Sequence, residues 1–227
     1  MNRIVQDELL DTLAPADQRA IHSRRDLRRL NCWMRHPAIM ADVMQRIVGH
    51  QTPGQLTELG AGDGTFLLSV ARRLAPHWRG VSATLLDRHE NVTPETLADF
   101  ATLGWRTKAV TTDVFAWPET PEAVVVANLF LHHFEPAPLA ELLGLISQRS
   151  RLFIALEPRR SLWPRFCSRL LGAIGCNHVT RHDAVVSVRA GFSGHELSAL
   201  WPDQSHWQLT EQPAGAFSQL FIARKNG

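Results

Sequence analysis

The chain has 227 residues and a mass of 25.5 kDa, which fits one α/β domain with a small cap. Hydrophobic residues make up 44% of it and charged residues 20%, which excludes intrinsic disorder as its main state. The formal net charge of +2 does not favour a nucleic-acid binder, and the three cysteines fit neither a disulfide framework nor a zinc motif. No signal peptide or membrane-spanning run is recognisable, so we expect a cytoplasmic protein.

Residues 1–50 are predicted to form a helical N-terminal cap. Apolar residues recur there every three or four positions, and Pro15 and Pro37 are typical of helix starts. From residue 51 to residue 227 short apolar segments alternate with helical ones, which predicts a second, larger domain.

The alternation in this larger domain predicts seven strands. They are residues 55–59, 81–87, 105–110, 123–128, 151–157, 207–211 and 217–224. Helices are predicted at residues 64–75, 93–103, 136–148 and 193–201, with Thr93 as an N-cap and a capping box at 193–196. The pattern indicates a Rossmann-like, seven-stranded, mostly parallel sheet with an antiparallel C-terminal hairpin and helices on both faces.

Residues 159–192 are too many for an ordinary connection and are predicted to form an insertion or lid. Between residues 159 and 189 six arginines face one aspartate, and apolar residues lie among them at helical spacing. Such a basic amphipathic helix could lie on an anionic membrane or clamp an acidic substrate. The plain alternative is a helix that packs against the sheet and leaves its arginines in solvent.

The most informative motif follows the first predicted strand and reads Glu58-Leu-Gly60-Ala-Gly62-Asp-Gly64. Glycines let the backbone approach a ligand, and the helix start behind them offers free N–H groups. A phosphate-binding P-loop would need Gly-Lys-Ser/Thr, and the carboxylate of Asp63 would repel a pyrophosphate but attract an ammonium group. The motif resembles motif I of the class I methyltransferases that use S-adenosylmethionine.

The resemblance continues at the ends of the next strands. It implies that Asp87 accepts the ribose hydroxyls, and that Asp113 accepts the adenine amino group with the Val114 N–H opposite a ring nitrogen. The backbone around Gly60 and Asn128 would hold the methionine end. The cofactor would thus be S-adenosylmethionine and the product S-adenosylhomocysteine. The implied cofactor-binding residues are Glu58, Gly60, Ala61, Gly62, Asp63, Gly64, Asp87, Arg88, Asp113, Val114, Asn128 and Leu129.

Within this class the chain resembles bacterial small-molecule methyltransferases of secondary metabolism, which act on quinones and phenolic polyketides. The segments that carry this resemblance are 26–31, 131–134, 157–159 and 183–192. It implies O- or C-methylation of a small acceptor, aromatic or lipid-like, and no nucleic-acid partner. Two alternatives remain open: a catalytically silent binding or sensor protein with this fold, and a methyltransferase for a macromolecule.

Histidine is suited to take a proton from a phenolic acceptor. His132 and His133 follow the fourth strand and are the predicted catalytic residues; on an extended backbone they would point to opposite sides. His178 is a further candidate base, as is His182. No metal is predicted, because adjacent histidines do not chelate like an i, i+4 pair and no carboxylate-thiolate cluster accompanies them. The predicted substrate contacts are Asn31, Trp33, Trp163 and His182.

Overall fold

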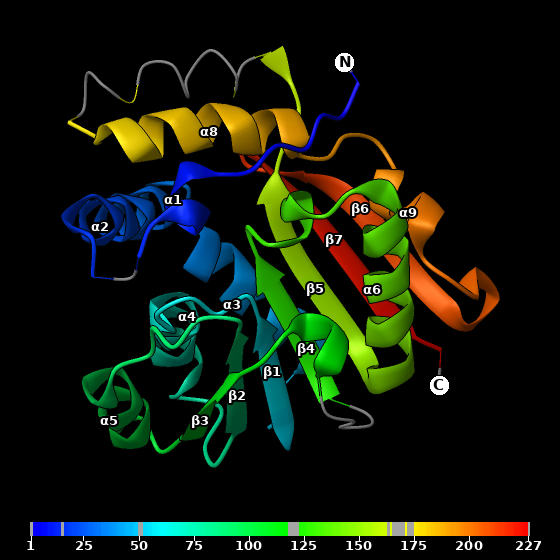
Figure 1. Cartoon of the computed structure of the whole chain (residues 1–227). Helices are drawn as coiled ribbons and strands as arrows, with labels where there is room; N and C mark the ends of the chain where they lie inside the picture. Colours follow the sequence, from blue (N-terminus) through cyan, green and yellow to red (C-terminus); the bar gives the residue numbers. More distant parts are fainter. Residues whose placement is uncertain are drawn as a thin grey trace.

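The structure, a computed structural model, describes residues 2–14, 16–49, 52–117, 123–162, 164, 171 and 175–226. Its centre is a seven-stranded sheet in the order β3-β2-β1-β4-β5-β7-β6. Neighbours from β3 to β5 are parallel, and β7 pairs antiparallel with β5 and β6 (Figure 1). The predicted fold class is therefore confirmed. The strands are β1 (Gln55–Leu59), β2 (Ser82–Asp87), β3 (Arg106–Thr111), β4 (Ala123–Asn128), β5 (Ser150–Pro158), β6 (Trp207–Ala214) and β7 (Ser218–Lys225).

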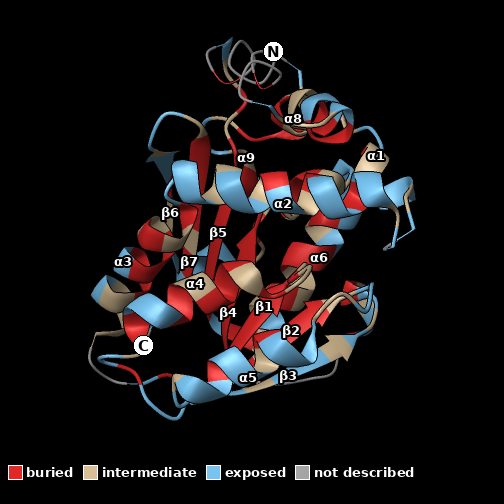
Figure 2. Ribbon diagram, turned by 90° about the vertical axis from the view of Figure 1, so that its left-hand side faces the viewer, coloured by how far each residue is buried: buried red, intermediate tan, exposed pale blue. Residues whose placement is uncertain are grey.

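Helices cover both faces of the sheet and enclose two apolar clusters. On one face lie α3 (His36–Val48), α4 (Thr65–Leu74) and α5 (Pro94–Thr102), and on the other α6 (Pro136–Arg149) and α9 (Glu196–Leu200). Strand β4 serves both clusters, because Val124 and Val126 point into the first, whereas Val125 and Ala127 point into the second. Figure 2 shows the central strands buried between the two helical layers.

Two predicted helix starts can be checked against hydrogen bonds. Thr93 is the N-cap of α5 and accepts from the Thr96 N–H at 3.3 Å. At α9 only one of the two hydrogen bonds of the predicted capping box forms: Glu196 accepts from the Ser193 N–H at 3.0 Å. The Ser193 hydroxyl accepts from Arg160 instead. The helix consequently begins at Glu196, later than the sequence predicts.

A cap lies across the carboxyl ends of the parallel strands (Figure 1). It consists of α1 (Leu9–Thr12), α2 (Gln18–Trp33) and α8 (His178–Ala190), the last of which lies in the predicted insertion. The N–H groups of Leu9 and Leu10 donate to the Asp183 carboxylate of α8, at 2.8 and 3.0 Å. The N-terminal segment and the insertion therefore form one layer.

The predicted boundary of the N-terminal cap at residue 50 differs from what the structure shows. Helix α3 lies against one face of the sheet, where Met40, Val43 and Met44 join the same apolar cluster as Leu56 of β1. Helical periodicity identifies an apolar face but not the surface that it covers, so α3 could not be separated from α2 by sequence pattern alone.

The insertion also differs from the prediction at Arg160. Its side chain is buried and donates to the Gly191 carbonyl and the Ser193 hydroxyl, and it forms an ion pair with Glu196. Most of the expected basic amphipathic helix, including Trp163, lies outside the described residues, so its contact with an anionic membrane stays a prediction. In the described part of the chain, no helix combines the length and apolar character needed to cross a bilayer.

Candidate functional site

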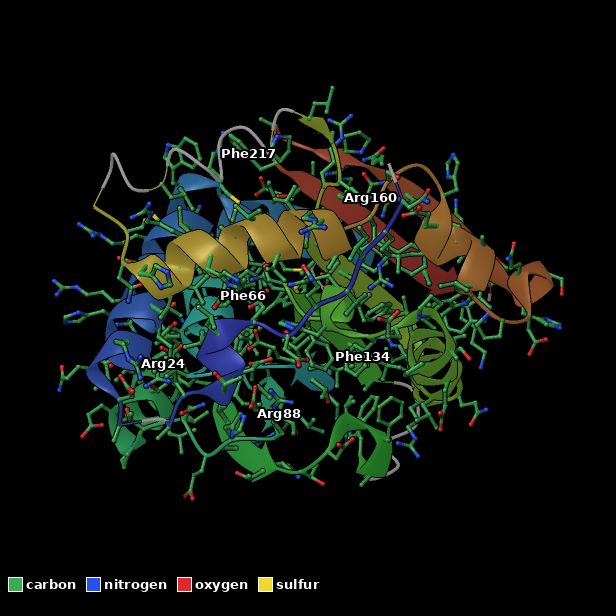
Figure 3. The ribbon with its side chains drawn as sticks, turned by 45° about the horizontal axis from the view of Figure 1, so that its top comes forward. Arg24, Phe66, Arg88, Phe134, Arg160 and Phe217 are labelled. Atoms are coloured by element: carbon green, nitrogen blue, oxygen red, sulfur yellow. The ribbon has the colours of Figure 1, made fainter. Side chains whose placement is uncertain are left out.

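A cavity of about 420 Å³ lies between the cap and the carboxyl ends of the parallel strands. Parallel α/β sheets bind ligands at this edge. The structure brings together here all the implied cofactor residues except Gly64, which is not in the lining; a Cβ on Gly64 would lie 2.7 Å from Cδ1 of Leu85. Figure 3 labels four residues of the lining that come from different parts of the chain: Arg24 from α2, Phe66 from α4, Arg88 after β2 and Phe134 after β4.

The glycine loop after β1 has the backbone that its sequence predicts. Gly60, Gly62 and Gly64 have φ angles of 67°, 56° and 75°, in the left-handed region. Leu129, at the end of β4, has a φ of 53°, which is uncommon for a residue other than glycine. Strained backbone thus borders the cavity on the β4 side, as is frequent at ligand sites.

Glu58 carries a buried carboxyl group at the end of β1. Its Oε2 has no hydrogen-bond partner among the described residues. Burial, together with the charges of Asp63 and Asp87, raises the pKa of Glu58 well above its usual range. Because buried polar groups are nearly always hydrogen-bonded, this oxygen indicates a ligand with a donor group.

Asp87 is the last residue of β2, and Asp113 follows the end of β3. Both line the cavity. The Asp87 carboxylate accepts from the N–H groups of Gly62 and His89, both at 2.8 Å, and thereby fixes the glycine loop. Asp113 accepts from the Phe115 N–H at 2.8 Å. An ionised carboxylate can accept about four hydrogen bonds, so both retain capacity for a ligand's hydroxyl or amino group.

The carboxylate of Asp63 lines the cavity and has partners within the protein. It accepts from the N–H and the hydroxyl of Thr65, and it forms an ion pair with Arg28 of α2 at 2.6 Å. On the other side of the loop, Arg88 pairs with Asp11 at 3.1 Å. These ion pairs attach the cap to the loops after β1 and β2. No sequence pattern predicts them, because the partners lie far apart in the chain.

The side chain of Asn128 at the end of β4 is held from two sides. Its Oδ1 lies 2.6 Å from Nδ1 of the buried His36, and its Nδ2 donates to Asn31 at 3.3 Å. Asn31 lines the cavity, as predicted for a substrate contact. Sequence analysis missed His36, which also bonds Ser218 of β7. The Asn128 backbone is therefore fixed for ligand contact by groups outside the motif.

We expect His36 to make stability depend on pH. Burial lowers its pKa to about 4, although the hydrogen bond with Asn128 acts in the other direction. The unfolded chain, in which the pKa is about 6.5, then binds more protons below that pH, so stability falls as pH decreases from 6.5 toward 4, by roughly 3 kcal/mol. Urea unfolding should show that the free energy of unfolding decreases more steeply over this pH range in the native protein than in His36→Gln. Parallel curves for the two proteins would contradict this assignment.

The predicted histidine pair lies in η2 (Leu131–His133), a 3-10 turn after β4. The two rings do not point to opposite sides, as an extended backbone would require; their centroids are 4.2 Å apart. Glu157, buried at the end of β5, holds this turn. Its Oε1 accepts from the N–H groups of Phe130 and Leu131, and its Oε2 lies 2.8 Å from His132 Nδ1.

The cap contributes a second carboxylate to this turn. Oε1 of the buried Glu8 lies 3.3 Å from His132 Nε2, and Glu8 also accepts from the Ser187 hydroxyl of α8. Burial acts to lower the pKa of His132, but its hydrogen bonds with Glu157 and Glu8 raise it to about 9. Burial acts to raise the pKa of Glu8, but the hydrogen bond with His132 and the charge of that ring outweigh burial and lower the pKa to about 2. Sequence analysis gave Glu8 no functional role.

Two predicted substrate residues lie elsewhere. Trp33 is 63% exposed and packs on Phe217 with ring centroids 5.0 Å apart, outside the cavity lining. Residues two apart on a helix point about 200° apart, so Asn31 and Trp33 could not both face the cavity. His182 is half-exposed, bonds Asp183 and is not in the lining either. His178 is exposed at the start of α8, and Trp163 lies outside the described residues.

Comparisons with known proteins give structural matches only. No protein-family model matches the sequence, and no curated protein does. Among solved structures, the plantazolicin methyltransferase BpumL, crystallised with a triazolic analogue and S-adenosylhomocysteine, is 12% identical with a TM-score of 0.63, over 93% of each chain. ChlM, the magnesium protoporphyrin IX methyltransferase of Synechocystis PCC 6803, is 12% identical with a TM-score of 0.55, over 85% of this chain and 83% of its own.

A third similar structure is the riboflavin-analogue dimethyltransferase RosA of Streptomyces davawensis. It is 16% identical with a TM-score of 0.61 over 97% of this chain, which spans 62% of the length of RosA. At such identities the likeness establishes the fold alone. The chain therefore has the Rossmann-like fold of the class I methyltransferases.

Proposed function

We propose that this protein transfers a methyl group from S-adenosylmethionine to a small acceptor. The observation that carries the proposal is the cavity at the carboxyl edge of the sheet, where the left-handed glycine loop, Asp87, Asp113 and Asn128 line one space. The unpartnered Oε2 of Glu58 in the same lining fits a cofactor with an ammonium group. Of the similar structures, BpumL and ChlM were both solved with the product of this cofactor.

Each cofactor contact follows from the strand end that supplies it. Asp87 accepts from the ribose hydroxyls, and Asp113 accepts from the adenine amino group beside the Val114 N–H. Glu58 and the backbone at Gly60 and Asn128 hold the methionine end. The bound cofactor supplies an electrophilic methyl group on a sulfonium. The protein contributes chiefly alignment, which is worth about 7–11 kcal/mol in such reactions.

The acceptor lies on the side of the cavity formed by η2 and the cap. His132, His133, Phe134 and Ser187 line this side. Both ring nitrogens of His132 already face Glu157 and Glu8, so His133 offers the ring that an acceptor hydroxyl can reach. An aromatic ring next to polar groups suits an aromatic or lipid-like molecule. We propose that the histidine pair acts at the acceptor's oxygen or carbon.

Calorimetric titration with S-adenosylmethionine tests the cofactor half of the proposal. We expect binding, and a loss of about 10- to 100-fold in affinity for Asp87→Ala, because charge-assisted hydrogen bonds to the ribose disappear. Asp99→Ala is the matched control, since it removes only an exposed ion pair with Arg72. Absence of binding at millimolar cofactor in the native protein would refute the proposal.

A turnover assay separates the enzyme from a silent binding protein. With a panel of phenols and quinols as acceptors, an enzyme releases S-adenosylhomocysteine, whereas a sensor binds the cofactor without turnover. A macromolecule as acceptor would show itself by binding that weakens strongly with salt.

A further inference from the structure

Three metal-ligating side chains meet beside the cofactor residues. They are Glu8 from the cap and His132 and His133 from η2, and their ligand atoms all lie within 4.8 Å of one another. The prediction of no metal rested on two premises: that adjacent histidines do not chelate like an i, i+4 pair, and that no carboxylate-thiolate cluster accompanies them. In the structure the 3-10 turn places the two rings side by side, and the cap brings the carboxylate of Glu8 to them.

The chemistry of this ligand set is that of a divalent transition metal. Two imidazoles and one carboxylate form a set that binds iron(II) or zinc and leaves coordination positions open. Glu8 and His132 are buried, and Oε1 of Glu8 lies 3.3 Å from Nε2 of His132, so two of the three donors already converge. A divalent cation between them would take the place of the proton on His132 as the positive charge beside the buried carboxylate of Glu8.

The groups behind the three side chains have the arrangement typical of metal centres. Metal-binding histidines usually donate their second N–H to a carboxylate, which fixes the ring and leaves the other nitrogen for the ion. Glu157 takes Nδ1 of His132 in this way at 2.8 Å, so that Nε2 is the nitrogen turned toward Glu8. Ser187 donates to Glu8, and Asp11 lies 3.7 Å from Nδ1 of His133.

We propose that Glu8, His132 and His133 bind one divalent transition-metal ion at the acceptor end of the cavity. Its open positions would face the cavity that all three residues line. Resting on the proposed function, this assigns the acceptor to molecules with a coordinating hydroxyl, such as phenols or enols. The hydroxyl releases its proton to solvent on binding the ion. The resulting oxyanion takes the methyl group, and the sulfonium becomes a neutral thioether.

The test is a zinc titration of the whole chain after removal of metal with a chelator, without cofactor. We expect one ion per chain, and at least about a tenfold loss of affinity in Glu8→Gln and in His133→Gln. His182→Gln is the matched control: it also removes a histidine paired with a carboxylate, but outside the cluster, and should bind zinc as the native protein does. Cobalt(II) should give the visible absorption of a nitrogen- and oxygen-ligated ion.

Absence of zinc binding in the native chain would overturn the proposal. So would native affinity in both Glu8→Gln and His133→Gln, since the ion would then sit on other histidines. Circular dichroism checks the fold of each variant. If one of the two variants does not fold, the zinc affinity of the other decides the test. Cofactor titration of the same preparations separates the two proposals. Zinc binding without cofactor binding keeps the metal site and refutes the methyltransferase, and the reverse result refutes only the metal site.

Discussion

Replacing Glu157 by alanine is expected to lower the free energy of unfolding by about 3–5 kcal/mol. Its buried carboxylate accepts from three consecutive N–H groups of the β4 turn, those of residues 130–132, and from the His132 ring. Removal leaves these donors buried without an acceptor, and each lost partner costs about 1–3 kcal/mol. Glu157→Gln should have a free energy of unfolding between those of the native protein and Glu157→Ala, because it keeps one accepting oxygen. Urea unfolding followed by circular dichroism measures the difference.

Glu211 provides a matched control for this experiment. Its carboxylate accepts from the N–H groups of Leu197 and Ser198 and from the Ser198 hydroxyl, at the start of α9 and outside the cavity lining. Glu211→Ala should therefore be destabilising as well, yet leave the affinities for cofactor and zinc unchanged. Glu157→Ala should reduce both affinities. Native stability in Glu157→Ala would show that the β4 turn does not depend on this carboxylate.

The second large effect is expected at Gly60. A Cβ there would lie 2.2 Å from Cδ2 of Phe130, whose ring packs edge-on against Phe134 at 5.1 Å. Gly60→Ala combines this overlap, worth about 1–3 kcal/mol, with the left-handed backbone, worth about 1–2 kcal/mol for an L-residue. We expect a total loss of about 2–5 kcal/mol in unfolding free energy. Displacement of Phe130, which lines the cavity, should also weaken cofactor binding.

Gly62→Ala separates the two contributions to this loss. Gly62 has a similar φ of 56°, but a Cβ there would have no neighbour within 4 Å. Only the backbone contribution of about 1–2 kcal/mol should therefore remain. Unfolding is measured without cofactor, since both glycines line the cavity. Equal losses in the two variants would mean that Phe130 moves aside freely and that the close approach of the loop to β4 has no energetic weight.

The parts of the fold that depend on local pattern were predictable. Strands β1 and β4 have the predicted bounds, because short apolar runs next to turn residues define a strand from nearby sequence alone. That the implied cofactor residues line one cavity was also predictable. Topology brings the carboxyl ends of parallel strands to one edge, so a polar residue after each strand reaches the same cavity.

The remainder of the site depends on contacts between distant segments. Glu8 meets His132 across 124 positions, and His36 meets Asn128 across 92, and neither pair has a signature in a single sequence. The prediction that His133 points to the opposite side from His132 was wrong for a local reason. The residues after β4 form a 3-10 turn instead of extending the strand, and the Glu157 carboxylate that stabilises this turn comes from β5.

The attachment of the N-terminal segment to α8 has a consequence for the order in which the molecule matures. The Leu10 N–H finds its acceptor in Asp183, 173 positions later, and Arg3 donates to the Ala190 carbonyl, 187 positions later. Because a chain leaves the ribosome from its N-terminal side, residues 3–10 emerge long before α8 has been made. Strands β1 to β5 can assemble in the meantime, so this wall of the cavity closes only after residues 183–190 have been added.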